Sequence, residues 1–440
     1  MISSRLLLAA ALAGPALLDA AVIGTNPPAD PLTAERIATL PADQQPAWRE
    51  YLDRSIAQQT AEKAFFAAEL KAYRMTQPVL PPEGRGGGLS LTRPAAWYAS
   101  DEARTLADHV LSFQTPAGGW SKNMNYADHP RRPGESFAPA NAAPAAAAAV
   151  TASAKTQDND APRDPSWHYV GTFDNNATTT QLRFLARIAT AADERHRAPY
   201  RTALLRGLDY VFAAQFPNGG FPQVYPLEGG YHDAITYNDN ALANILEFLT
   251  DVAHGEGDFA LVPAQIRTRA AASVQRGIAC IVACQITVNG HRTVWCQQHD
   301  ALTLAPASAR NYEMPSQSGS ESDDIMLYLM ALPDPSPEVV AAVHAAAAWF
   351  EKTGLRDVAY RPAADGTGRK LQPSPGAGPT WARYYEIGSD RPIFGDRDKS
   401  IHDDVNEISQ ERRNGYSWFN DGPKRALERY AEWAKAHPAR

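Results

Sequence analysis

Cysteine is scarce in this chain of 440 residues, which has only Cys280, Cys284 and Cys296. Their odd number, with two of them four positions apart, does not match the Cys/His ladders of zinc sites. A zinc domain is therefore not expected. Cys296 could take part in one disulfide bond in an oxidising compartment. The 44% hydrophobic content predicts a well-filled core instead.

A positive net charge and long apolar runs are also lacking. The formal net charge of −7 argues against nucleic acid as the main partner. An acidic substrate remains compatible with it, because a site needs only local arginines or a bound cation. The apolar run Leu6–Leu18 follows Arg5 and is too short to cross a bilayer. We interpret residues 1–20 as a secretory signal peptide, and we expect a soluble, monomeric protein exported to the periplasm or the medium, without membrane association.

Two common catalytic signatures are missing. The glycines at 86–88 are not followed by Lys-Ser/Thr, so they do not form a phosphate-binding loop. No G-x-S-x-G segment occurs, and the histidines at 129, 168, 232, 299 and 402 lie in different loops. The sequence marks none of these histidines as a catalytic base.

The chain does contain two alternating internal repeats. "LSFQTPAGGW" (111–120) returns as "FAAQFPNGGF" (212–221) and more faintly as "IVACQITVNG" (281–290). "FDNNATTTQLRFL" (173–185) returns as "YNDNALANILEFL" (237–249), with looser copies at 320–330 and 418–430. The first repeat is a helix that ends in Gln, a turn and Gly; the second starts with Asp or Asn at a helix N-cap.

This alternation predicts stacked helical hairpins arranged in a ring, a mostly α fold of the α/α toroid type. Residues 21–93 are expected to form an N-terminal helical segment and linker, and residues 94–440 the catalytic toroid domain. In such a ring, Asp174, Asn175, Asn238 and Asp239 would converge at one mouth. Simple N-capping is the alternative, although doubled Asp-Asn pairs exceed what capping requires.

Three sets of polar or aromatic side chains could carry the chemistry. The oxygen-rich set Asp174, Asn175 and Asp239 has the hard ligands that calcium prefers. The arginine set lies at turns and element ends, where binding loops occur, and consists of Arg310, Arg383 and Arg397. The third set includes Trp120 and Lys122, and its aromatic faces can stack on sugar rings or serve as packing.

Several motifs in order resemble one known family. They are "GGWSKN", "GTFDNNATTTQLRFLARI", "FPNGGFPQVYPLEGGYHDAITYNDNAL", "ARNYEMPSQSGSES", "ARYYEIGSDRPIFGDRD" and "ERRNGYSWF". Together they look like the family 10 polysaccharide lyases, which are secreted pectate lyases, from about residue 94 onwards. The resemblance implies an (α/α)₃ toroid with short β segments. It also implies calcium-dependent β-elimination of polygalacturonate, an acidic polysaccharide, with a 4,5-unsaturated product.

The resemblance also implies roles for particular residues. Asp174, Asn175 and Asp239 would hold Ca²⁺, Arg310 and Arg383 would bind substrate carboxylates, and Arg397 would be the base. Lys122 and Trp120 would contact the substrate. Arginine is normally always protonated. We therefore expect the flanking Asp396 and Asp398 to point away from the Arg397 guanidinium, and we expect an alkaline activity optimum.

Two other functions fit parts of the pattern. An inverting glycoside hydrolase on the same fold could use Asp174 and Asp239 as general acid and base. A non-catalytic pectin-binding protein would bind polygalacturonate without shortening it. Chelator treatment and the ultraviolet absorbance of an unsaturated product distinguish the lyase from the hydrolase, and the absence of chain shortening would mark the binding protein.

Overall fold

The computed structural model describes residues 22–82, 84, 89–139, 164 and 167–439. The expected signal peptide, the glycines at 86–88 and residues 140–163 and 165–166 lie outside these ranges. The helices are α1 (Ala34–Ile37), α2 (Gln45–Ala72), α3 (Asp101–Ser112), α5 (Thr179–Ala191), α6 (Glu194–Ala214), α7 (Ala241–His254), α8 (Ala264–Cys284), α9 (Glu321–Met330), α10 (Pro337–Thr353), α11 (Gln410–Gly415) and α12 (Gly422–Ala436).

The strands are short, between two and five residues. They are β1 (Val22–Thr25), β2 (Ile235–Thr236), β3 (Thr287–Val288), β4 (His291–Arg292), β5 (Gln298–His299), β6 (Pro306–Ala307), β7 (Gln317–Ser318), β8 (Val358–Pro362), β9 (Arg369–Pro373), β10 (Trp381–Ala382), β11 (Tyr384–Tyr385), β12 (Phe394–Gly395), β13 (Ser400–His402) and β14 (Phe419–Asn420). In the described part of the chain they form six small antiparallel sheets, the longest ladder being β8–β9, which pairs Val358 with Pro373 and Pro362 with Arg369.

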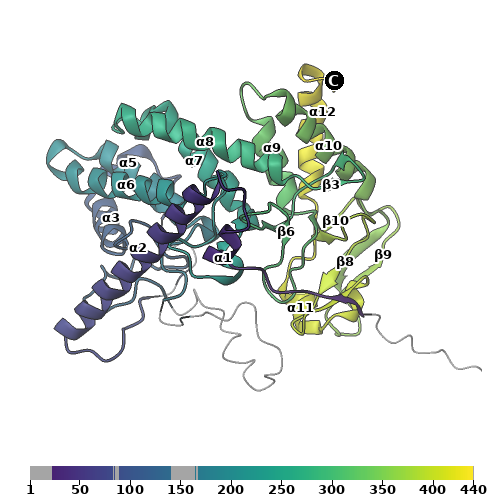
Figure 1. Ribbon diagram of the computed structural model, residues 1–440, viewed down its shortest axis with the longest axis horizontal. Helices are drawn as coiled ribbons and strands as arrows, with labels where there is room; N and C mark the ends of the chain where they lie inside the picture. Colours follow the sequence, from purple (N-terminus) through teal and green to yellow (C-terminus); the bar gives the residue numbers. More distant parts are fainter. Residues whose placement is uncertain (1–21, 83, 85–88, 140–163, 165–166, 440) are drawn as a thin grey trace, which may run out of the picture.

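The expectation of a mostly α (α/α)₃ toroid is wrong. Helices α3 and α5 to α8 gather on one side of the molecule, whereas the strands of the C-terminal third occupy the other side (Figure 1). The sequence did not reveal these strands because a segment of two residues cannot display a period-2 pattern. The helical repeat therefore describes part of the chain, and extended loops with small sheets form the rest.

The Gln at the end of each first-repeat helix has a common structural role. The Gln114 side-chain amide donates to the carbonyl oxygen of Ala203 on α6, at 2.9 Å. Gln215 donates in the same way to Ser273 on α8, and Gln285 to Ala342 on α10. Each amide also donates to a carbonyl of its own turn or hairpin. The repeat thus links each helix end to the next long helix, and it confirms that the faint third copy belongs to the series.

One large hydrophobic core extends through both halves. It contains the inner faces of α5, α6, α7 and α8 and the C-terminal aromatics, among them Trp381 and Trp418. The long helix α2 crosses the molecule (Figure 1) and buries Trp48 and Tyr51 against Phe216. The N-terminal strand β1 pairs with β13 (Ser400–His402), so the start of the described chain joins a sheet of its C-terminal part.

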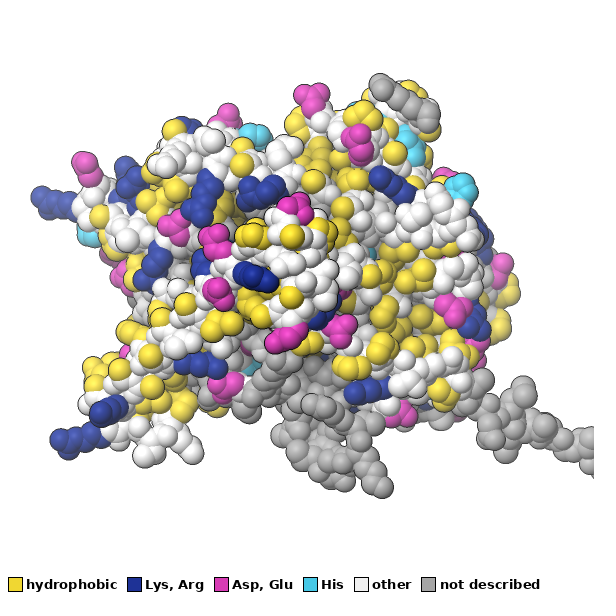
Figure 2. Space-filling model, viewed as in Figure 1, with side chains coloured by type: hydrophobic (Ala, Val, Ile, Leu, Met, Phe, Trp, Pro, Cys, Tyr) yellow, Lys and Arg dark blue, Asp and Glu magenta, His cyan; other side chains and the backbone are white. Residues whose placement is uncertain are grey.

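The three cysteines are buried free thiols, so the disulfide considered for Cys296 is not formed. On the face shown in Figure 2, basic and acidic side chains are interspersed over the helices. No helix among the described residues combines the length and apolar character needed to cross a membrane. The boundary between residues 93 and 94 stays a prediction.

Candidate active site

Two equivalent turns carry the doubled acidic and amide residues. The 3₁₀ turns η4 (Asp174–Asn176) and η6 (Asn238–Asn240) precede α5 and α7. Asn175 has φ 52° and Asp239 has φ 50°, the left-handed region in which Asn and Asp are favoured among residues with a side chain. No side chain caps α5 or α7. N-capping therefore does not explain these residues.

The two turns meet at the side chain of Asn238. Its Nδ2 lies 3.4 Å from Asp174 Oδ1 and 3.1 Å from Asp239 Oδ2. One amide thus reaches both carboxylates, although their turns are more than sixty positions apart in the sequence. The predicted convergence of Asp174 and Asp239 is confirmed.

The two carboxylates differ in their electrostatic surroundings. Burial opposes ionisation of Asp174, but Lys122, which forms an ion pair with it, outweighs burial and lowers the pKa of that carboxyl. Partial removal from water, followed by the charge of Asp174, raises the pKa of Asp239 to about 6. This mutual effect places both groups in one electrostatic cluster.

The oxygen donors of this cluster fit a hard cation. Asp174 and Asp239 offer carboxylate oxygens, and exposed Asn175 offers an amide oxygen while its Nδ2 donates to Asn123 Oδ1 at 3.3 Å. Such an incomplete shell of oxygens leaves room for water and substrate ligands on calcium. A pocket of about 410 Å³ opens beside Lys122, Asn123 and Asn175.

Two of the predicted arginines lie next to this cluster. Arg383 is buried, pairs with Glu321, and its Nη2 lies 3.4 Å from Asn238 Oδ1. Arg310 binds Glu313 through Nε at 2.9 Å and through Nη2. Among the described residues, the buried Nε of Arg383 has no hydrogen-bond partner.

Sequence reasoning missed the buried carboxylates that hold these arginines. Burial disfavours the ionised form of Glu313, but Arg310 outweighs it and lowers the pKa of this carboxyl to about 2. Glu313 also accepts the Tyr416 hydroxyl at 2.6 Å. Glu313 follows Arg310 by three positions, and Glu321 is in the same motif, so their spacing within "ARNYEMPSQSGSES" was the available signal.

Arg397 lies at the edge of the arginine group. Its guanidinium carbon is 5.6 Å from the centre of the Tyr312 ring, which also carries Arg310 and Arg412 at 5.1 and 4.4 Å. Its backbone oxygen accepts from Asn311 at 2.7 Å. Gly395 is required here, since a Cβ would lie 2.5 Å from the Tyr312 carbonyl oxygen.

The flanking aspartates point away from the guanidinium, as predicted. Asp396 accepts from the Arg397 backbone and from Ser409, and Asp398 accepts from Ser400. Neither of them forms an ion pair with Arg397 within the described part of the chain. The sequence did not identify the real partner, Glu411, which binds Arg397 at two points, both 3.1 Å long.

Trp120 does not fit its predicted role. Its side chain has 0% exposure, and its indole Nε1 donates to Val110 O at 2.8 Å. Trp295 and Trp381 make the same kind of bond to the ends of other helices. A side chain without exposed surface cannot stack on a sugar, so Trp120 is a packing residue.

Lys122 lies in the site, but its ammonium faces Asp174. The two side chains are only 12% and 5% exposed. The ammonium also lies 3.5 Å from the centre of the Tyr169 ring. The predicted contact with substrate stays a prediction for Lys122.

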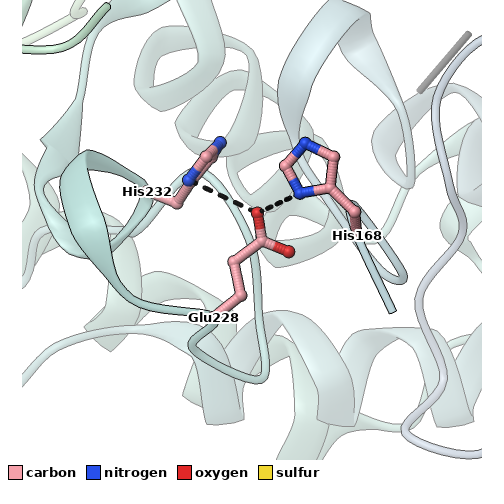
Figure 3. Close-up of side chains that lie close together, drawn as sticks. All are labelled: His168, Glu228 and His232. Carbon is pink, nitrogen blue, oxygen red and sulfur yellow. Dashed lines mark ion pairs between the residues drawn. The ribbon is translucent and has the colours of Figure 1, made fainter. Parts of the chain in front are cut away.

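Behind Tyr169 lies a buried cluster of His168, Glu228 and His232 (Figure 3). Both histidines point their Nδ1 atoms at the same oxygen of Glu228, at 2.9 and 3.3 Å. Burial lowers the pKa of His232 to about 4, so this imidazole is neutral. With two nitrogen donors and one carboxylate, the cluster does not suit calcium, which prefers oxygen ligands. The sequence analysis did not identify this cluster: Glu228 and His232 lie four positions apart in one motif, but His168 comes from a separate segment.

Comparison with known proteins identifies the class of this site. The family model described as "Pectic acid lyase" matches residues 114–427. The chain therefore belongs to this family and is a pectate lyase.

Solved structures agree with this assignment. A family 10 polysaccharide lyase from Cellvibrio cellulosa is 32% identical, with a TM-score of 0.61 over 79% of this chain and 99% of that one. A mutant of the Cellvibrio enzyme, in complex with trigalacturonic acid, gives the same identity and TM-score over 77% and 97%. No curated protein matches. Family membership decides against the glycoside hydrolase and the non-catalytic binding protein.

Proposed function

We propose that this pectate lyase cleaves polygalacturonate by calcium-assisted β-elimination, with Arg397 as the base and a 4,5-unsaturated oligogalacturonide as the product. We further propose that it acts after export from the cell. The observation that carries this proposal is the Asn238 amide that spans Asp174 and Asp239. It gathers two carboxylates beside Arg383, an arrangement that suits a cation and a uronate together.

Calcium, when bound by Asp174, Asn175 and Asp239, would withdraw charge from the uronate carboxylate and make the neighbouring C5 hydrogen more acidic. Arg310 and Arg383 would orient substrate carboxylates through paired hydrogen bonds, for which a planar guanidinium is suited. Their pairing with Glu313 and Glu321 fixes both guanidinium planes in advance. The two guanidinium groups then lose less orientational freedom when the substrate binds.

The elimination requires a proton acceptor at C5. A neutral Arg397 side chain would take this proton, the C5–H electrons would form the C4=C5 double bond, and the bond from C4 to the glycosidic oxygen would break. The leaving oxygen would take a proton from solvent. Arg397 lies with Arg310 and Arg412 around the shared Tyr312 ring, and its guanidinium pairs with Glu411.

Ultraviolet absorbance tests the reaction directly. Purified protein is incubated with polygalacturonate, with and without a chelator, and the absorbance of the unsaturated end is followed. Absorbance that grows only without chelator is expected. Chain shortening with no ultraviolet signal contradicts β-elimination, and equal signals with and without chelator contradict the metal requirement.

A further inference from the structure

The ammonium of Lys122 is fixed on a predicted calcium ligand. It pairs with the Asp174 carboxylate on one side and lies against the Tyr169 ring on the other. A cation over an aromatic face is attracted by the ring quadrupole, most strongly where water is excluded. At 12% exposure, the Lys122 side chain is in such a place. A flexible lysine is thereby converted into a fixed positive charge.

The Tyr169 ring is itself held from behind. Its backbone nitrogen donates to Glu228 Oε2 at 3.0 Å, and its hydroxyl lies 3.0 Å from His232 Nε2. Glu228 is in turn bound by His168 and His232 (Figure 3). Tyr169 has φ 55°, an uncommon conformation for an aromatic residue. Buried contacts at both of its ends support this conformation.

The fixed lysine changes the charge that a metal would meet. Arg310 with Glu313 and Arg383 with Glu321 are neutral pairs. The ionised carboxylates of Asp174 and Asp239 together with Lys122 leave one net negative charge. A calcium ion would convert this to one net positive charge, and one uronate carboxylate would restore neutrality. Calcium affinity follows the number of charges in the site.

We propose that Lys122, held by Tyr169 and the cluster behind it, is a fixed counter-cation that weakens calcium binding at Asp174 in the free enzyme and makes it depend on a uronate carboxylate. This inference rests on the proposed calcium site. Each ligand then raises the affinity for the other, because such coupling is reciprocal. Lys122 would be a positioning residue for the metal and would set how strongly metal and substrate depend on each other.

Calorimetric titration of the purified protein with calcium alone, at pH 8, tests this inference. Lys122→Met is expected to bind calcium at least about tenfold more tightly than the wild type, because a like charge near the metal is removed. Tyr169→Leu should shift the affinity in the same direction by less, and Tyr169→Phe, which keeps the ring, should stay near the wild type. Lys352→Met, which removes a lysine paired with Asp390 at the surface, is the matched control.

The same titrations are repeated with galacturonate, which has no glycosidic bond to break. This uronate should tighten calcium binding by the wild type and have little effect on Lys122→Met. Unchanged or weaker calcium binding by Lys122→Met overturns the inference, and an unchanged Tyr169→Leu overturns the role of the ring.

Asp174→Asn separates this inference from the proposed function. If this variant binds calcium like the wild type, the calcium site itself is wrong. If it loses calcium while Lys122→Met shows no gain, only the role of Lys122 is wrong.

Discussion

Arg397 and Glu411 form a two-point ion pair, Nε to Oε2 and Nη2 to Oε1, each 3.1 Å long. Two charge-assisted hydrogen bonds of this kind fix the orientation of the guanidinium. The proposed base is therefore positioned by a neighbour that the sequence did not single out. The Arg397 side chain is 33% exposed, so the pair can open when substrate arrives.

Arg397→Ala should lower kcat by at least about a thousandfold and change KM little, because the base is lost while Arg310 and Arg383 remain. Initial rates on polygalacturonate measure both constants. Arg391→Ala is the matched control: its guanidinium pairs with Glu386 and Asp403. Arg397→Ala turnover above a tenth of the wild-type rate would rule out the role as base.

Asp239→Ala should raise the calcium concentration for half-maximal activity at least about tenfold, because one of few charged ligands is removed. A calcium titration of the rate, repeated as direct calcium binding, measures it. Asp251→Ala removes a carboxylate that pairs with Arg183 on the outside of the helices and serves as control. An unchanged calcium titration would take Asp239 out of the metal site.

Trp120→Phe should destabilise the protein by about 1–2 kcal/mol, since the Val110 carbonyl loses the indole hydrogen bond and keeps only that from the Phe113 backbone at 3.3 Å. KM for polygalacturonate should not change. Urea denaturation measures the free energy of unfolding. Trp97→Phe provides the control, because the buried Nε1 of Trp97 has no hydrogen-bond partner among the described residues. A raised KM with unchanged stability would restore the stacking role.

Glu62→Gln should alter the pH dependence of stability. Burial raises the pKa of Glu62 on α2 to about 7, despite the hydrogen bond from Ala117 at 2.7 Å. Because the native pKa lies above the ordinary value of 4.5, the contribution of Glu62 to stability is most favourable below pH 4.5 and is lost as the pH rises to about 7. The variant should escape this loss, a relative gain of up to about 3 kcal/mol at pH 8.

Chemical denaturation at pH 5 and pH 8 checks this expectation. Glu50→Gln, on the same helix but with its side chain 81% exposed, should show no such pH dependence. Parallel wild-type and Glu62→Gln stabilities across this range would contradict it.

The sequence predicted the proximity of Asp174 and Asp239 correctly, whereas its prediction of the architecture was wrong. The proximity of Asp174 and Asp239 was predictable because each lies in one copy of the same repeat. The two copies form equivalent backbone turns. The sequence analysis did not identify the counter-ions Glu313, Glu321 and Glu411. The tertiary structure decides which arginine each of these carboxylates pairs with.

Trp120 and the fold class were misjudged for different physical reasons. Exposure decides whether an aromatic residue stacks or packs, and exposure depends on tertiary structure. Strands of two to five residues, such as β10 or β14, are too short for side-chain alternation to be recognised. The group of His168, Glu228 and His232 was missed because His168 reaches the other two from a distant segment, and the spacing of Glu228 and His232 alone does not define a cluster.

Because β1 pairs with β13, the position of the amino-terminal strand affects the proposed active site. Directly after β1, the Asn26 amide donates to the carbonyl oxygens of Arg310, Asn311 and Glu313. A fusion partner or trimming at this end would disturb the loop that presents Arg310 and touches Arg397, while the distant helices kept their packing. An inactive yet well-folded preparation could thus originate in the design of its N-terminus, far from any catalytic position in the sequence.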